Sequence, residues 1–353
     1  YLAYKLFTES AEASNLKDPE IETLETLEQM TPKALQGYVQ RRMSTRYEEG
    51  YIKGVHDKDA MLILAELLRF YHNIGLLRFP ADARILAYLY WNHLASAKAK
   101  KDWEEQFAGI RTILNVFPSS DSFSDTIDEL THAIAAATPK LDWISESTSA
   151  KAATYLFTLL AEEGDFAFSL EAWNLSENFQ MYLKQNRSLK DFEQSLKNGN
   201  TPIQENFRMV RNWLRSYVPK AETSVRPEEV LEAIIILLDK RNSPKTEHKI
   251  SLYKEVSGLN GDHPNIIKST LPLHYNDFIL RLQRFDTEDV QRYRQFSKMK
   301  KELLDEAHAD LRLNEFKPRV MSSFVRNQLI NEVYLPLIGD NLAKQMGAAG
   351  DQK

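Results

Sequence analysis

The stretch PEEVLEAIIILL, from Pro227 to Leu238, contains the longest strongly apolar run of the sequence. Its last six residues are all apolar, so a helix built from them carries hydrophobic side chains on most of its faces. Proline suits the first turn of a helix, where its missing N–H costs nothing, and the two glutamates after it lie where the helix dipole favours acidic groups. The stretch therefore predicts a helix at the centre of a hydrophobic core.

The segment before it, TPIQENFRMVRNWLRSY from Thr201 to Tyr217, predicts a second, amphipathic helix. It opens with Thr–Pro and places Gln204 at the third helical position, as in a capping box. Apolar side chains then recur at spacings of three and four residues, which form one buried stripe. They are Phe207, Val210, Leu214 and Tyr217.

Signals for helices recur over most of the chain. Glycine is scarce, at 12 of 353 residues, and periodic segments alternate with Pro- and Asn/Gly-containing breaks. Further helices are expected at about 59–73, 81–98, 100–116, 122–137, 148–163 and 167–186. The sequence thus predicts a mainly α fold, either a multi-helix bundle or an irregular α-solenoid.

The character of the sequence changes after Asn242. The stretch RNSPKTEHK is polar and typical of a linker, and residues 248–275 combine β-favouring residues with a Gly-Asp-His-Pro turn, which predicts a small β-hairpin. Helices resume near Asn276 and are interrupted around Pro318. The expected domains are a helical domain at 1–225, a mixed domain at 226–318 and a lead-in helix at 319–353.

The composition of the chain argues against several classes of function. The net charge of −5 argues against a dominant nucleic-acid footprint, and the longest strongly apolar run is far shorter than the roughly 20 residues of a membrane helix. With no cysteine there is no disulfide or thiolate chemistry, which fits a reducing compartment. We read the chain as a piece of a longer protein, since it begins with Tyr1 and ends in GAAGDQK.

Specific catalytic motifs are missing from the sequence. It contains no GxxxxGK[ST] loop, no GxGxxG after a strand, and no HExxH, EF-hand or GxSxG pattern. We therefore predict no catalytic residue and no metal ligand set in this chain.

Two groups of acidic and histidine side chains allow both a functional and a structural interpretation. His56, Asp57 and Asp59 suit metal binding or acid–base chemistry, but either aspartate also suits capping of the helix that follows. Asp305 and His308 lie three residues apart on an expected helix, as in half of a carboxylate metal site or on an ordinary solvated face. For the first group we favour helix capping, and for the second group a solvated helix face.

Basic residues gather in two places. Arg and Lys neutralise phosphates, so both clusters are candidates for contact with nucleic acid, although charged helix faces are commonly just solvated. The first cluster consists of Arg41, Arg42 and Arg46, and the second of Arg281, Arg284, Arg292, Arg294, Lys298, Lys300 and Lys301.

The final segment, LRLNEFKPRVMSSFVRNQLINEVYLPLIGDNLAKQMGAAGD from Leu311 to Asp351, supplies a resemblance. It resembles the region upstream of the ATPase module in very long bacterial proteins known as DNA repair ATPases of the AAA type. The stretches RYEEGYIKGVHDKDA (46–60) and GLNGDHPNI (258–266) look like internal landmarks of the same family.

The resemblance implies a helical recognition or coupling element of a cytoplasmic, ATP-driven machine. ATP and Mg²⁺ would be bound by the ATPase module, beyond Lys353, and no cofactor by this chain. It also implies that Val320, Met321 and Ser322 lie near the adenine. Candidate partners are that module, DNA and a second copy of the chain; no membrane is expected. The alternative is a stand-alone helical scaffold that binds proteins, without an ATPase.

Overall fold

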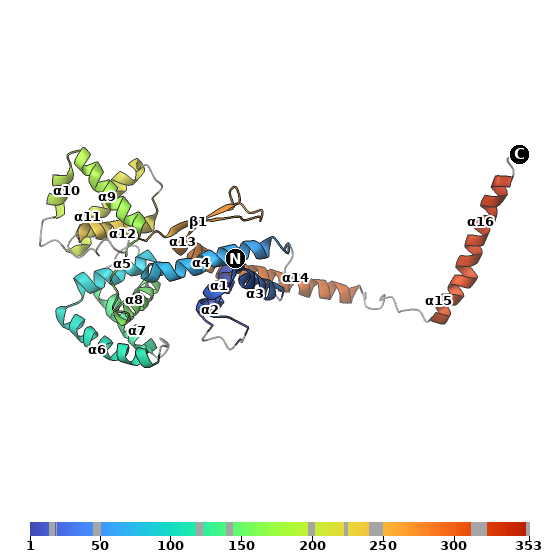
Figure 1. Cartoon of the computed structure of the whole chain (residues 1–353), viewed down its shortest axis with the longest axis horizontal. Coiled ribbons are helices and arrows are strands. Elements are labelled where there is room, and N and C mark those ends of the chain that lie inside the picture. Colours follow the sequence, from blue (N-terminus) through green and yellow to red (C-terminus); the bar gives the residue numbers. More distant parts are fainter. Residues whose placement is uncertain are drawn as a thin grey trace. The chain divides into compact units, whose positions relative to one another are not determined.

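The computed structural model describes residues 1–13, 18, 20–44, 51–117, 123–138, 144–196, 202–221, 225–239, 250–311 and 323–350 (Figure 1). The α-helices up to the hairpin are α1 (Leu2–Ala11), α2 (Leu24–Gln29), α3 (Pro32–Ser44), α4 (His56–Ile74), α5 (Ala81–Leu89), α6 (Ala97–Val116), α7 (Ser124–Ala137), α8 (Glu146–Ala161), α9 (Leu170–Gln185), α10 (Leu189–Leu196), α11 (Ile203–Tyr217) and α12 (Pro227–Leu238). After the strands β1 (Tyr253–Ser257) and β2 (Thr270–His274) come α13 (Tyr275–Arg284), α14 (Val290–Asp310), α15 (Ser323–Leu329) and α16 (Leu335–Gly350). The mainly α prediction is confirmed.

Short irregular helical turns join some of these helices. They are η1 (Gly75–Arg78), η2 (Tyr90–Leu94), η4 (Val218–Lys220), η6 (Phe285–Asp289) and η8 (Ile330–Tyr334). The described residues divide into two compact units, Tyr1–Gln283 and Arg284–Lys353. The expected boundary at 225/226 does not coincide with this division, because α12 packs on α5, α9 and α11 and so belongs to the body of the first unit.

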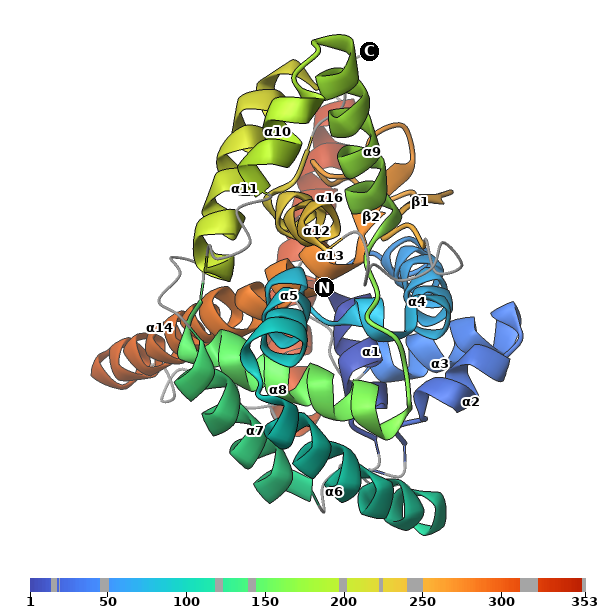
Figure 2. The same ribbon diagram turned by 90° about the vertical axis from the view of Figure 1, so that its left-hand side faces the viewer.

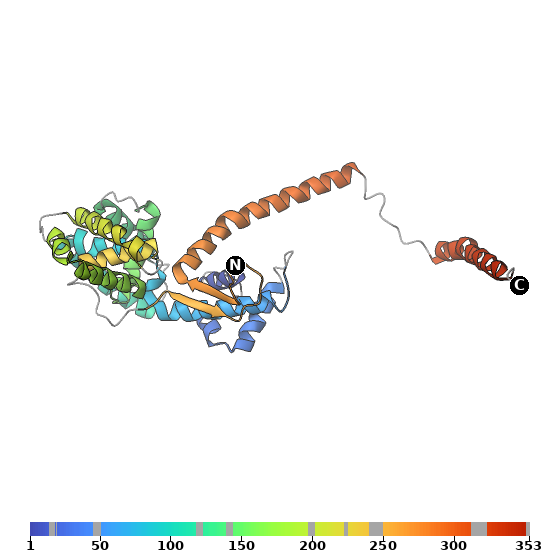
Figure 3. The same cartoon turned by 90° about the horizontal axis from the view of Figure 1, so that it is seen from above.

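The hairpin predicted at 248–275 is confirmed. β1 and β2 are antiparallel, with Tyr253 opposite His274 and Ser257 opposite Thr270. Leu273 and Val256 turn inward from the hairpin and join the buried residues of α1 to α4 and α13 in one hydrophobic cluster. Figure 3 shows the two strands running alongside α4.

Helix α5 links the other two hydrophobic clusters of the first unit. Ile85, Tyr88 and Leu89 pack with α9 to α12, whereas Leu86 and Ala87 pack with α6, α7 and α8. In Figure 2, α5 accordingly lies between these two groups of helices. A helix with two buried faces must be apolar nearly all round, as the sequence ARILAYL is.

A buried ion pair connects α5 to α12. The Arg84 guanidinium donates to Glu232 Oε1 at 2.7 Å, and the two side chains are 1% and 2% exposed. Arg84 also donates to the carbonyl oxygens of Phe79 and Ala167 at 2.9 Å. The second Glu232 oxygen accepts from the backbone N–H of Ser169 at 2.6 Å, just before α9. Both buried charges are thus surrounded by hydrogen-bond partners.

One stretch among the described residues, His56–Leu94, is long and apolar enough to cross a membrane by length and composition alone. Its best window has a mean hydropathy of 1.3, and 44% of that window is buried inside the protein. The stretch is interrupted by η1 and Pro80, and its apolar residues fill all three hydrophobic clusters. These features are those of core helices.

Candidate functional site

The acidic residues at the start of α4 hold distant segments together. Asp59 accepts hydrogen bonds from the backbone N–H groups of Asn260, at 2.9 Å, and Gly261, at 2.7 Å, in the loop between β1 and β2. The two sequence stretches 46–60 and 258–266 therefore meet at this point, about 200 residues apart along the chain. A Cβ atom on Gly261 would lie 2.8 Å from the Asp59 carboxylate, so a larger residue there would displace that carboxylate.

Asp57 holds α4 to α3. Its carboxylate accepts from Gln40 Nε2 at 2.7 Å and from the backbone N–H of Gly54. Burial by itself would raise the pKa of Asp57, but hydrogen bonds from Gln40 and from backbone N–H groups outweigh it and hold that pKa below its usual range. His56 Nδ1 accepts from the backbone N–H of Ile52 at 3.1 Å. These three side chains thus have structural partners, with Asp59 capping the hairpin loop and not its own helix.

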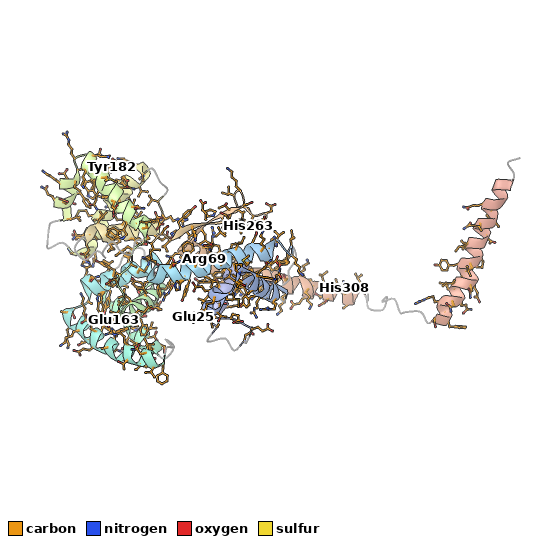
Figure 4. All side chains as sticks on the ribbon, in the orientation of Figure 1. Glu25, Arg69, Glu163, Tyr182, His263 and His308 are labelled. Carbon is orange, nitrogen blue, oxygen red and sulfur yellow. The ribbon has the colours of Figure 1, made fainter. Side chains whose placement is uncertain are left out.

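A metal site is not apparent in the described part of the chain. There, no group of three or more His, Cys, Asp or Glu side chains is arranged to hold a metal ion. Asp305 and His308 lie on α14, which has no buried residue, and His308 is labelled near the end of that helix in Figure 4.

An open groove of about 590 Å³ runs along one face of α9. From α9, the groove receives residues spaced three and four apart, which places them on one stripe of the helix. They are Glu171, Asn174, Leu175, Asn178, Met181, Tyr182 and Gln185. The opposite wall comes from the end of α11, η4 and the start of α12. Figure 4 labels Tyr182 on this helix.

Three amide side chains line the groove and are exposed: Asn174, Asn178 and Gln185. None of their side chains hydrogen-bonds to another described residue, so each has a donor and an acceptor available to a ligand. On the facing wall, Lys220 Nζ donates to the Tyr182 hydroxyl at 3.0 Å and lies over its ring.

Two carboxylates give one end of the groove a negative potential. Burial is the main cause that raises the pKa of Glu229, and the nearby charge of Glu171 adds to it. Glu229 accepts from the Arg226 backbone N–H at 3.2 Å, and Glu171 accepts from the Ser251 hydroxyl. A cation placed beside these carboxylates would relieve their mutual repulsion and lower the pKa of Glu229.

Arg42, in the first basic cluster, is buried and paired with acidic side chains. Its guanidinium is 10% exposed and pairs with Glu9 at 3.1 Å and Asp18 at 3.3 Å. Burial would lower the pKa of Arg42, but these hydrogen bonds outweigh it and raise that pKa. The positive charge of Arg42 is thus paired inside the fold, and its assignment as a nucleic-acid contact stays a prediction. Arg41 is exposed on α3, and Arg46 lies outside the described residues.

The second basic cluster is exposed throughout. Its members lie on α13, at the junction with η6, and along α14: Arg281, Arg284, Arg292, Arg294, Lys298, Lys300 and Lys301. Three of them pair within the helix, Arg284 with Glu288, Arg292 with Asp289, and Lys298 with Glu302. Such exposed pairs contribute little to stability and leave the cations accessible.

The three residues expected near an adenine, Val320, Met321 and Ser322, lie outside the described residues. Helices α15 and α16, which follow them, have many exposed apolar side chains, among them Phe324 at 75%.

The fold defines the class of the protein as mainly α with one small antiparallel hairpin. Comparison with protein-family models, with curated proteins and with solved structures finds no match to this chain. The resemblance to AAA-type DNA repair ATPases therefore stays a prediction from the sequence.

The groove along α9 was not predicted from the sequence. Its signal is present in α9, where Asn174, Asn178 and Gln185 share one helical face with Met181. An amphipathic helix normally has a charged outer face, so amides and a methionine on that face are a mark of a binding surface. The opposing wall, however, comes from α11 and α12, and only the fold brings it there.

Proposed function

We propose that the chain is a non-catalytic helical recognition element that binds an extended, basic segment of a partner polypeptide in the α9 groove. The observation that carries the proposal is the stripe of unpartnered amides in an open groove of about 590 Å³, with Glu171 at the end of the same stripe and Glu229 on the facing wall. Side-chain amides both donate and accept, as a peptide backbone does, and the carboxylates suit Lys or Arg side chains.

The chemistry of the chain supports recognition over catalysis. The acidic and histidine side chains at the start of α4 hold α3 and the hairpin loop. The buried pair of Arg84 and Glu232 joins α5 to α12. These polar groups are engaged in the fold, whereas the free hydrogen-bonding groups of the groove are exposed amides.

Binding of fluorescent peptides to the full chain tests the proposal. An extended Lys-containing decapeptide should bind, and the same peptide with Glu in place of Lys should bind at least about tenfold more weakly because the carboxylates repel it. Asn178→Ala and Glu229→Gln should each weaken the basic peptide severalfold. Asn212→Ala provides a matched control, since Asn212 is exposed on the neighbouring helix α11 and does not line the groove. Equal binding by all variants would sink the assignment.

A second candidate function, DNA binding, is favoured by the seven exposed cations of the second basic cluster. Binding of duplex DNA should then weaken steeply with salt, because cations on phosphates release counterions. Replacing Arg292, Arg294 and Lys298 by Glu should abolish it. Unchanged DNA affinity in this variant would contradict the assignment.

We further propose, from the sequence resemblance, that this recognition element serves a cytoplasmic, ATP-driven machine whose ATPase module binds ATP and Mg²⁺. The stand-alone protein-binding scaffold is the alternative. Sequencing the transcript beyond Lys353 separates the two: a strand followed by GxxxxGK[ST] supports the machine, and its absence leaves the scaffold.

A further inference from the structure

Helix α14, in the second unit, presents an apolar stripe that no described residue covers. None of its 21 residues is buried. Its large apolar side chains recur three and four residues apart, so they share one face of the helix. They are Tyr293, Phe296, Met299, Leu303 and Leu304, and each of these residues is 49–61% exposed. Most helical stability comes from packing such a face, so it favours an apolar partner.

Charges on α14 are separated by sign along its length. The first half contains five cations and no acid after Asp289: Arg292, Arg294, Lys298, Lys300 and Lys301. The second half contains four acids and no Lys or Arg: Glu302, Asp305, Glu306 and Asp310. The helix is therefore basic at one end and acidic at the other.

This charge pattern complements itself only in an antiparallel arrangement. Two copies of α14 lying side by side in opposite directions place the basic half of each on the acidic half of the other. At 3.6 residues per turn, Arg292 and Glu306 lie along one side of the apolar stripe, so Arg292 of each copy faces Glu306 of the other, whereas Arg294 and Asp305 lie on the far side of the helix. A parallel pair would instead bring like charges together.

The apolar stripe fits the same arrangement. With the two-fold axis near Met299 and Lys300, Phe296 of each copy faces Leu303 of the other, and Tyr293 faces the small Ala307. Large side chains thus meet across the axis in reciprocal pairs, as a two-fold interface requires. Such a side chain would insert into the depression that is lined by Phe296, Met299, Lys300, Leu303 and Leu304.

We propose that α14 binds α14 of a second copy of this chain as an antiparallel helix pair. The proposal concerns a surface of the second unit and does not rest on the α9 groove. The helix is roughly 30 Å long, which supports a reversible dimer.

Sedimentation of the full chain, free of nucleic acid, tests this pairing. The parent chain should dimerise with increasing concentration. Arg292→Glu/Arg294→Glu lowers the charge of the first half of the helix from +5 to +1, and Asp305→Lys/Glu306→Lys changes that of the second half from −4 to 0. Each variant alone should self-associate at least about tenfold more weakly, because most of the attraction between the two halves is lost. An equimolar mixture of the two should recover part of the dimer, since the unaltered basic half of one variant then meets the unaltered acidic half of the other.

The control is Lys98→Glu/Lys101→Glu, which changes the net charge by the same amount on exposed residues of α6 and should leave dimerisation unchanged. Circular dichroism of each variant should match the parent chain. A chain that is monomeric at all concentrations, one that dimerises only when DNA is added, or a dimer that survives both charge changes would overturn the proposal.

Discussion

Helices α12 and α14 use hydrophobic side chains in opposite ways. In α12, the residues from Ala233 to Leu237 are at most 3% exposed and pack against α5, α9 and α11. In α14, every residue keeps substantial solvent exposure, although the helix carries aromatic and aliphatic side chains. A helix that is apolar all round has to be buried within its own chain, whereas one with an apolar stripe and many charges retains a face for a partner.

The largest difference between the two helices is expected at the buried ion pair of α12. Glu232→Ala on α12 leaves the Arg84 guanidinium buried and uncompensated, so the free energy of unfolding should fall by about 3–5 kcal/mol. Urea denaturation followed by circular dichroism measures it. Glu302→Ala on α14 removes an exposed ion pair and should change stability by less than about 0.5 kcal/mol. A similar loss in both variants would contradict the contrast.

A smaller effect is expected at the junction of α4 with the hairpin loop. Asp59→Ala leaves the N–H groups of Asn260 and Gly261 without their acceptor, and unfolding should become easier by about 1–3 kcal/mol. Hydrogen exchange at these two amides should accelerate while that of α12 amides stays slow. Asp102→Ala, at an exposed position of α6, is the control. Unchanged exchange at Asn260 and Gly261 would show that the carboxylate does not hold the loop.

Stability should also depend on pH through His274, which is buried at the end of β2. Burial, and then the charge of Arg226, lowers the pKa of His274. The unfolded chain therefore binds a proton more readily than the folded one, so the stability that neutral His274 provides is complete above pH 6.5 and is lost as the pH falls through the lowered pKa.

His274→Asn removes this titration and keeps an acceptor for the Asp277 N–H. Denaturation at pH 7.5 and at pH 5.5 should show a smaller loss of stability in the variant than in the parent chain. Equal losses would assign the pH dependence to other groups.

The smallest effect is expected on α14 itself. Leu303→Ala removes an apolar side chain that is 60% exposed, so the unfolding of the monomeric chain at low concentration should change by less than about 0.5 kcal/mol. Leu214→Ala, at a fully buried position of α11, should cost about 2–5 kcal/mol. A large loss at Leu303 would mean that α14 packs within its own chain.

The helices could be predicted closely because their signals are local. The expected helix at 59–73 is found as α4, the one at 148–163 as α8, and the one at 167–186 as α9. The single helix expected at 81–98 ends earlier, because the chain turns at Ala95 and Ser96 caps α6 through its side chain. Ser96 is a recognisable N-cap, but the apolar pattern around it led to the prediction of one continuous helix.

The candidate site could be predicted only in part. Arg42 and Arg294 look alike in the sequence, yet Arg42 is buried and pairs with Glu9, whereas Arg294 is exposed on α14. Asp57 and Asp59 stood out in the sequence, but Asp57 has a partner on α3 and Asp59 has its partners in a loop some 200 residues away. Nothing local in a sequence specifies which remote backbone amides a carboxylate will meet.

Local signals in the sequence predict the helical character, the central position of PEEVLEAIIILL and the place of the hairpin, because capping, periodicity and turn residues act over a few neighbouring positions. The sharing of α5 between two clusters, the contact of Asp59 with the hairpin loop and the groove between α9 and α12 are seen only in the folded chain. These features depend on contacts between residues distant along the chain, and the packing of the whole fold selects them.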